Sequence, residues 1–271
     1  MKKVLIFSLA FAFQMLFLFS FCFADGIFEK PKVGESGDQT INPLIFLFDK
    51  GNFNIAVGLR STYFRLTDAN QNMIGNLNRL EEEQNYSPIK PLIQINLSRY
   101  LAFEFGYDSF KAMALNQPDY DKNWSDGNLE WQNYMLAMQI RLPDFHPSII
   151  PYFQWGVAYT KANFNAANWH RYGFPSPATY NSWVGQGNRV QDYTDYRRLI
   201  TADDCWGPLF GLGVDYFFWK HLALNLDLRY LITQSKLTYQ LADSRGVFSE
   251  QTGTFNMSSW IVGLGLKYYF F

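Results

Sequence analysis

The feature that most constrains this chain is its last stretch, Trp260 to Phe271, which reads WIVGLGLKYYFF. Side chains of a β-strand point alternately to opposite faces, so one face here is apolar with aromatic residues at both ends, while the other carries glycines and a lysine. A soluble sheet buries its apolar face under a second layer, whereas a membrane barrel turns that face to lipid. The stretch alone leaves two alternatives open, a terminal strand of a β-sandwich and a strand of a membrane barrel.

The first residues have the layout of a secretory signal peptide. Lys2 and Lys3 precede an apolar run from Val4 to Phe21, and a small-x-small site at Cys22 to Ala24 comes directly before Asp25. We therefore expect a cleaved signal peptide at residues 1–24, with an uncleaved anchor as the alternative. No later apolar run approaches the roughly 20 residues that a membrane helix requires.

Composition excludes several classes of function. The chain has 23 Lys and Arg against 24 Asp and Glu, and loss of Lys2 and Lys3 leaves 21 against 24. This balance does not suggest a basic nucleic-acid surface, so no nucleic-acid partner is expected. Loss of the signal would leave Cys205 as the single cysteine, which excludes an intramolecular disulfide and favours a structural role.

Residues 25–51 are expected to form a periplasmic lead before the first strand. Within it, Pro43 to Phe48 is either a short strand or a plug.

Period-two alternation recurs along the rest of the chain and predicts eight strands. Long polar segments are expected as loops at 67–87, 116–128, 164–203 and 240–251, and short links at 98–100, 142–148 and 219–221. Regular alternation of long loops and short turns is typical of bacterial outer-membrane barrels and is not expected of a sandwich. Closure also leaves no unpaired strand edge facing lipid. We therefore predict an all-β fold, an eight-stranded antiparallel up-and-down transmembrane barrel spanning 52–271.

Three stretches also resemble a known family. They are PYFQWGVAYT at 151–160, GLGVDYFFWKHLALNLDLRY at 211–230 and SSWIVGLGLKYYF near the C-terminus. These stretches resemble the OmpW-like outer-membrane proteins, and the resemblance covers roughly Phe53 to Phe271. It implies an eight-stranded barrel that passes small hydrophobic molecules across the outer membrane, in some members by lateral exit through the wall. The lead at 25–48 and the long third loop depart from the family pattern.

The inward faces of the expected strands carry many charges. They are Arg60, Lys90, Glu104, Asp108, Arg141, Asp215, Asp227, Arg229 and Lys267. An eight-stranded barrel has an interior just wide enough for side chains or one small ligand, and a buried charge without a partner is costly. We expect a lumen charge network, which is either a structural salt-bridge cluster or a polar plug beneath a ligand site.

Two further sets of residues are candidates for transport. Four apolar inward residues nearer the outer end would line a ligand pocket, with local packing as the alternative: Phe64, Leu92, Leu209 and Leu231. Prolines cannot donate to a β-ladder, so Pro88, Pro91 and Pro208 are candidate points for a wall opening, unless they merely begin strands. On this reasoning, replacing Pro208 by alanine should reduce uptake of a hydrophobic compound.

The third expected loop, 164–203, is rich in aromatic residues and arginine. Such side chains are common anchors of contact surfaces, which leaves open adhesion, phage or lipopolysaccharide binding; a loop folded over its own barrel is the alternative. It contains Trp169, His170, Arg171, Tyr172, Phe174, Tyr180, Trp183, Tyr193 and Tyr196.

Enzymatic activity is not expected. The histidines after the signal are His146, His170 and His221, and the pair His146 and Ser148 falls in a periplasmic turn, away from outer-leaflet lipid. There is no zinc spacing, phosphate loop or nucleotide fingerprint, so neither a metal nor a cofactor is expected.

Two functions therefore stand side by side. The first is passage of small hydrophobic molecules across the bacterial outer membrane, and the second is a structural or surface-interaction barrel that acts through its outer loops. The expected partners are outer-membrane lipid and lipopolysaccharide, a small hydrophobic ligand, and the barrel-assembly machinery. The last would recognise the C-terminal aromatic strand.

Overall fold

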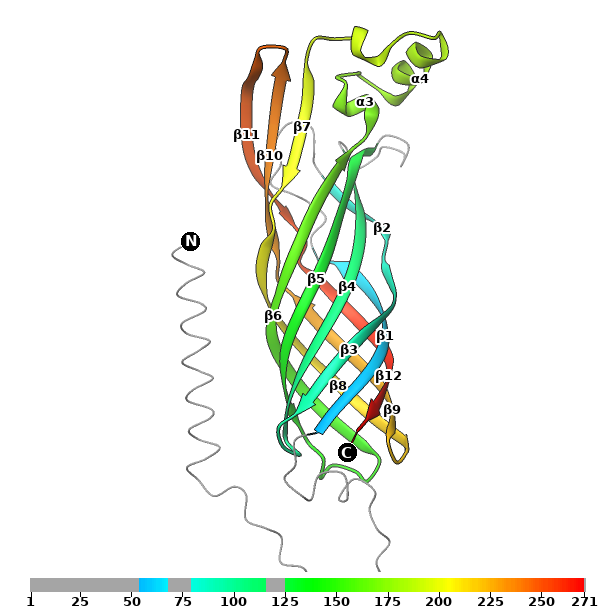
Figure 1. The fold of residues 1–271 in the computed structure, drawn as a ribbon, viewed down its shortest axis with the longest axis vertical. Helices are drawn as coiled ribbons and strands as arrows, with labels where there is room; N and C mark the ends of the chain where they lie inside the picture. The colour runs from blue at the N-terminus through cyan, green and yellow to red at the C-terminus, as the bar shows by residue number, and fades with distance from the viewer. Residues whose placement is uncertain (1–53, 68–78, 116–124, 271) are drawn as a thin grey trace, which may run out of the picture. The chain divides into compact units, whose positions relative to one another are not determined.

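The computed structural model describes residues 54–67, 79–115 and 125–270, and within these the chain forms a closed β-barrel (Figure 1). The expected signal peptide (1–24) and the lead (25–51) lie outside the described residues. Every wall strand is antiparallel to both neighbours, and the pairing of the first strand with the last closes the ring. The eight wall strands are β1 (Asn54–Leu66), β3 (Tyr86–Asn96), β4 (Leu101–Leu115), β5 (Ser125–Arg141), β6 (Ile149–Ala166), β8 (Cys205–Trp219), β9 (Leu222–Leu231) and β12 (Ser259–Tyr269).

The predicted eight-stranded antiparallel fold is confirmed. Short links between β3 and β4, β5 and β6, and β8 and β9 gather at one end of the barrel, together with the start of β1 and the end of β12 (Figure 1). We call this the turn end and the opposite end the loop end. No helix in the described part of the chain has the length and apolar character needed to cross a membrane.

The outer wall is apolar and ends in a band of aromatic residues, which we call the aromatic girdle. Each wall strand contributes one residue to it: Tyr63, Tyr86, Tyr107, Tyr134, Tyr159, Trp206, Tyr230 and Trp260. Several of these rings contact the next one around the wall, as in the pairs Tyr107–Tyr134 at 5.1 Å and Tyr159–Trp206 at 5.0 Å between ring centroids. From Trp260 to Phe270 the strand extends roughly 33 Å along its own direction. Because barrel strands are tilted by about 40° from the barrel axis, this corresponds to about 25 Å along the axis. The apolar outer wall therefore has the height of a bilayer's hydrocarbon band.

The inside-outside pattern inverts above the girdle. Below it, leucines such as Leu136 face outward and polar residues such as Gln139 face inward; above it, Glu130 and Gln132 face outward and Trp131 is buried. The same inversion occurs on β6, where exposed Lys161 alternates with buried neighbours. The barrel therefore continues beyond the girdle as a wall with a polar outside and an apolar inside.

The expectation of a continuous loop at 67–87 is wrong, because part of this segment belongs to the continued wall. Residues 79–84 form strand β2 (Arg79–Gln84), which pairs with the upper part of β4, and β3 begins at Tyr86. Leu80 is buried inside, whereas Glu83 lies outside, where it pairs with Lys111 at 3.0 Å. The acidic run therefore lies on a strand, because charge outside is what a wall in water requires. The expected loop at 116–128 is also too long, since β5 begins at Ser125.

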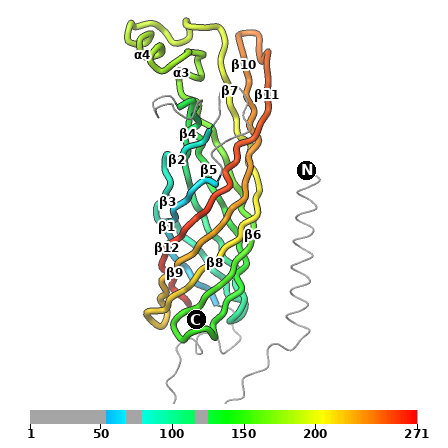
Figure 2. Tube along the Cα trace, turned by 180° about the vertical axis from the view of Figure 1, so that it is seen from behind, coloured from blue at the N-terminus to red at the C-terminus, as the bar shows by residue number. Residues whose placement is uncertain are grey.

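The expected loops at 164–203 and 240–251 are likewise folded. The first contains α3 (Asn168–Arg171), α4 (Pro177–Gly185), the 3-10 helix η2 (Val190–Asp192) and strand β7 (Arg197–Ala202). The second is a hairpin of β10 (Gln234–Asp243) and β11 (Gly246–Asn256), and β10 also pairs with β7. These three strands stand as a sheet at the loop end (Figure 2). Both segments were expected to be loops and instead contain strands. The expectation was wrong because strands above the girdle have polar outward faces, so that their sequences resemble those of polar loops.

Candidate functional site

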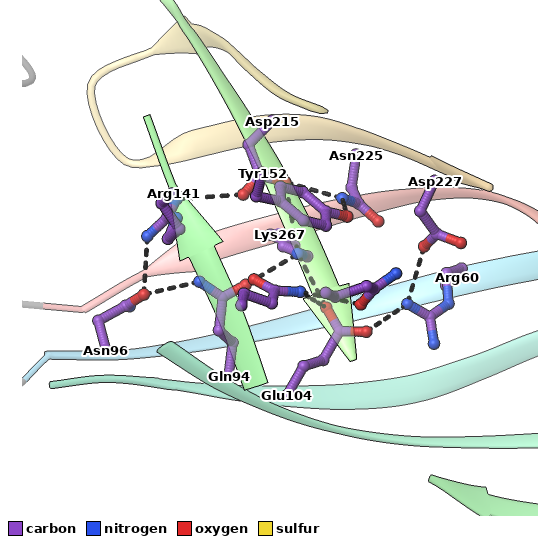
Figure 3. A network of polar contacts seen from close by, with 12 residues as sticks. Arg60, Gln94, Asn96, Glu104, Arg141, Tyr152, Asp215, Asn225, Asp227 and Lys267 are labelled. Carbon is purple, nitrogen blue, oxygen red and sulfur yellow. Dashed lines mark hydrogen bonds and ion pairs between the residues drawn. The ribbon is translucent and has the colours of Figure 1, made fainter. Parts of the chain in front are cut away.

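The lumen below the girdle contains a continuous charge network. Its charged members are the four cations Arg60, Arg141, Arg229 and Lys267 and the four anions Glu104, Asp108, Asp215 and Asp227. None is more than 3% exposed. Uncharged polar side chains join them, and every wall strand supplies at least one member of the cluster (Figure 3).

One part of the network is built on Glu104 of β4. Its Oε1 accepts from Arg60 Nη1 at 2.5 Å, and its Oε2 lies 3.0 Å from Lys267 Nζ. Arg60 Nη1 also donates to Asp227 Oδ2 at 3.0 Å, and Arg229 Nε donates to Asp227 Oδ1 at 2.8 Å. Three cations therefore share two carboxylates, one from β4 and one from β9; Figure 3 shows Arg60 between Glu104 and Asp227.

The other part is built on Asp215 of β8, nearer the turn end. Its Oδ2 accepts from Arg141 Nη2 at 3.1 Å and from the hydroxyl of Tyr269 at 2.7 Å. Its Oδ1 accepts from Asn225 Nδ2 at 2.8 Å and lies 3.3 Å from Lys267 Nζ. Lys267 therefore joins the two parts of the network.

The network is neutral as a whole, with four positive and four negative side chains. Charge balance and dense hydrogen bonding are what allow ionised groups to lie in a narrow lumen. A small apolar cluster closes the turn end beneath it, made of Ala56, Ile150, Phe217, Ala223 and Tyr269. The lower lumen is therefore filled by packed polar side chains, which we call the plug.

Sequence periodicity placed these eight residues on the inner face, and it placed Lys90 there too, where Lys90 is the ladder partner of Arg60. The Nζ atom of Lys90 lies 5.2 Å from the ring centroid of Tyr107, a girdle residue. It is half-buried and takes no part in the network contacts. Tyr152 and Tyr269 were not among the predicted network residues, although both hydroxyls are hydrogen-bonded in the network. Their signal was an aromatic residue on the inward face.

An upper apolar cluster fills the lumen above the network. Three of the four candidate lining residues belong to this cluster: Phe64, Leu209 and Leu231. Leu92 is also buried but is not a member of the cluster. Phe64 packs against Phe110 at 4.2 Å and edge-on against a tryptophan of β5 at 5.3 Å between ring centroids. The candidate lining thus consists of packed side chains that a ligand would have to displace.

The wall is interrupted between β3 and β4, and we call this place the wall break. The two strands pair from Asn96↔Ala102 to Leu92↔Gly106, and β4 pairs again with β2 only from Lys111 upward. Within the described residues, no ladder pair joins the segment 107–110 of β4 to β2 or β3. Two side-chain contacts cross this gap: the Ser109 amide donates to Ser87 Oγ at 3.2 Å, and Lys90 Nζ lies over the ring of Tyr107.

The prolines differ in their relation to this break. Pro88 and Pro91 lie on the β3 side of it, and both are exposed on the outer wall. Pro208 instead pairs with Val157 of β6, and its carbonyl oxygen accepts from the amide of Ile232 at 3.0 Å. The ladder therefore runs unbroken through Pro208, and among the candidate wall prolines only those of β3 adjoin an interruption.

The aromatic residues of segment 164–203 pack mainly within the loop end. The indole Nε1 of Trp169 donates to the carbonyl of Ser125 at 3.0 Å, and His170 Nδ1 lies 2.9 Å from Asp126 Oδ1. Phe174 is buried and stacks on Tyr193 at 3.8 Å between centroids. These contacts fold the segment onto β5 and onto itself.

The remaining histidines lie at turns. His146 Nδ1 accepts from the Ser148 amide at 3.1 Å, so this contact engages the backbone of the serine and not its hydroxyl. His221 lies in the β8–β9 turn, with Nδ1 3.3 Å from the carbonyl oxygen of Tyr269. Cys205 is a free, half-buried thiol at the start of β8. The described residues hold no group of three or more His, Cys, Asp or Glu arranged to bind a metal.

Comparison with known proteins identifies the fold. No family model and no curated protein matches the chain. Among solved structures, the outer membrane protein OprG from Pseudomonas aeruginosa matches with a TM-score of 0.52 at 16% identity, over 80% of this chain and 95% of that one. AlkL in lipid bilayers gives 0.49 at 15% identity over 80% and 90%, and outer membrane protein W from E. coli gives 0.48 at 16% over 79% and 97%. The likeness to OprG confirms the eight-stranded fold that the sequence resemblance implied.

Proposed function

We propose that this protein is a bacterial outer-membrane barrel that carries small hydrophobic molecules from the loop end into the bilayer through the wall break between β3 and β4. The observation that carries the proposal is the position of this break. It lies at the height of the girdle, directly beside the upper apolar cluster. A molecule that enters among apolar side chains would leave sideways into lipid, because the charged plug lies beneath it.

Three further features support this route. The apolar outer wall below the girdle matches the hydrocarbon band of a bilayer in height. The plug would exclude hydrophobic solutes from the lower lumen, since burying apolar matter among ionised groups would separate them from their partners. The upper cluster contains large side chains next to the break, notably Phe64 and Phe110, which would have to rotate aside to admit a ligand. We propose a carrier role without enzymatic chemistry.

The test is a reversible lock on the wall break. In a Cys205→Ser background, cysteines at Ser87 and Ser109 would join β3 and β4 where the Ser109 amide donates to Ser87 Oγ across the gap. Uptake of N-phenyl-1-naphthylamine into proteoliposomes would be followed by fluorescence. We expect oxidation to abolish uptake and reduction to restore it, because the lock prevents the strands from separating.

The matched control is a disulfide elsewhere in the wall. Leu136 and Val157 are cross-strand partners on the outer face of the continuous β5–β6 ladder. Cysteines at these positions should leave uptake unchanged in both redox states. Normal uptake by the oxidised β3–β4 lock would refute lateral passage, and absence of uptake by the unmodified protein would refute the carrier function.

A second function, surface binding by the loop end, has one observation in its favour. Val247 and Phe248 are 51% and 58% exposed near the tip of the β10–β11 hairpin, where the wall no longer faces lipid. Deletion of 164–203 would remove β7 and part of β6, so the sharper variants are Phe248→Ser and deletion of 176–193. Loss of cell-surface or phage binding with normal hydrophobic uptake would favour this function.

A further inference from the structure

An ion pair whose facing atoms make no hydrogen bond lies at the boundary between the charge network and the upper apolar cluster. Asp108 Oδ2 and Arg229 Nη2 are both buried without a hydrogen-bond partner among the described groups, and they lie 3.8 Å apart. Both residues are 1% exposed. Buried polar atoms without partners are uncommon in native proteins, and each calls for an explanation.

The rest of each side chain is firmly held, which fixes the direction of the unpaired atoms. Asp108 Oδ1 accepts from Thr62 Oγ1 at 2.7 Å, and Arg229 Nε donates to Asp227 at 2.8 Å. Arg229 Nη1 lies 3.1 Å from the sulfur of Met135, a member of the upper apolar cluster. The guanidinium therefore contacts the network on one side and the apolar cluster on the other.

The pair also lies at the wall break. Asp108 belongs to the segment 107–110 of β4, which has no ladder partner on the β3 side within the described residues. Arg229 approaches from β9 on the other side of the lumen. The unpaired donor and acceptor thus lie where the apolar cluster, the plug and the proposed exit meet.

We propose that Asp108 and Arg229 recognise the hydroxyl head of an otherwise apolar ligand, such as a long-chain alcohol. This inference rests on the proposed carrier function. A hydroxyl oxygen can accept from Arg229 Nη2 at about 2.9 Å while its proton is donated to Asp108 Oδ2 at about 2.7 Å, and a 3.8 Å separation permits both. The apolar tail would lie in the upper apolar cluster.

The same geometry discriminates against other heads. A carboxylate would bind Arg229 but face the negative charge of Asp108, and an ammonium group would meet the opposite conflict. An alkane would leave both polar atoms unpaired in the complex, which is how a site built for a hydroxyl rejects an analogue that lacks it. The expected order is therefore alcohol first, with alkane and carboxylate well behind.

The experiment uses the full mature chain in lipid nanodiscs with N-phenyl-1-naphthylamine as the reporter ligand. Displacement of the reporter by 1-dodecanol, dodecane and dodecanoate is measured, with partition into lipid corrected on protein-free nanodiscs. We expect dodecanol to displace it at about one-tenth of the concentration of the other two, the factor that one charge-assisted hydrogen bond supplies. The double variant Asp108→Leu with Arg229→Met keeps the network neutral and should lose this advantage.

A milder variant guards against misfolding. Asp108→Asn keeps an oxygen acceptor but removes the negative charge, so displacement by dodecanoate should improve severalfold while Asp204→Asn, at the outer surface, changes nothing. Equal displacement by alcohol and alkane in the unmodified protein, or an unchanged order in both lumen variants, would overturn the head-group inference. Failure of all three compounds and the reporter to bind would instead overturn the carrier function itself.

Discussion

Lys267→Met is the substitution that tests the charge network most directly. The Lys267 ammonium is fully buried and has three acceptors, Gln94 at 2.8 Å, Glu104 at 3.0 Å and Asp215 at 3.3 Å. Methionine keeps most of the side-chain volume, so the change removes charge and hydrogen bonds with little loss of packing. It leaves the network with three cations and four anions.

The expected cost follows from this imbalance. Removing one partner of a buried ion pair costs about 3–5 kcal/mol, because the remaining charge stays buried. With a denaturant slope of roughly 2 kcal/mol per M, the urea midpoint should fall by about 1.5–2.5 M. The measurement is urea unfolding of the protein in lipid vesicles, followed by tryptophan fluorescence.

A second variant separates charge balance from the loss of contacts. In Lys267→Met with Glu104→Gln, the network returns to three cations and three anions, so the double variant should be more stable than the sum of the two single changes predicts, by about 1–3 kcal/mol. Lys161→Met, on the exposed face above the girdle, should change stability by less than about 0.5 kcal/mol. A Lys267→Met midpoint within about 0.5 M of the unmodified protein, or strict additivity in the double variant, would refute the reasoning.

The remaining predictions concern the wall, its close packing and the loop end. Pro91→Ala supplies an N–H donor beside the wall break and should therefore reduce hydrophobic uptake into proteoliposomes severalfold. Pro208→Ala lies within a continuous ladder and should leave uptake unchanged. Equal effects of the two substitutions would contradict the position of the break. Gly156→Ala places a Cβ 2.0 Å from a backbone oxygen of β5 and should cost at least about 1–3 kcal/mol in urea unfolding. Gly185→Ala, where nothing lies within 4 Å, should be neutral, and a similar loss at both glycines would refute the packing argument. His170→Ala removes the 2.9 Å contact that ties α3 to β5, so limited proteolysis should cleave 164–203 faster. Unchanged or slower cleavage would count against that anchor.

The strands below the girdle could be predicted from the sequence because lipid and lumen impose one rule on them. Every second residue had to be apolar, and the residues between had to fill a narrow interior. This rule alone placed Arg60, Glu104 and Lys267 on the inner face, where they form ion pairs. It could not say which cation meets which anion, because partners come from strands far apart in the sequence.

Above the girdle the same rule failed. Residues 79–84 and the part of the β10–β11 hairpin within 240–251 were expected to be loops because their exposed residues are polar, such as Glu83 and Glu250. A strand with water outside and apolar residues inside has the alternation of a soluble sheet, and short strands of this kind are hard to tell from polar loops. The wall break had only the prolines of β3 as a signal, and the same signal at Pro208 marked an intact ladder.

The inversion at the girdle links these successes and failures to function. Above the girdle, a hydrophobic molecule inside the barrel is surrounded by apolar side chains, while the outside of the wall faces water. Below the girdle, the apolar surroundings lie outside the wall and the ionised groups lie inside. The two apolar regions therefore exchange places at one height, and a molecule that stays in apolar surroundings must cross the wall there. The missing β3–β4 pairs occur at this height, beside Tyr107 of the girdle. If the break lay elsewhere on the barrel, it would open either from the plug into lipid or from the apolar cluster into water, and neither would serve passage of a hydrophobic solute.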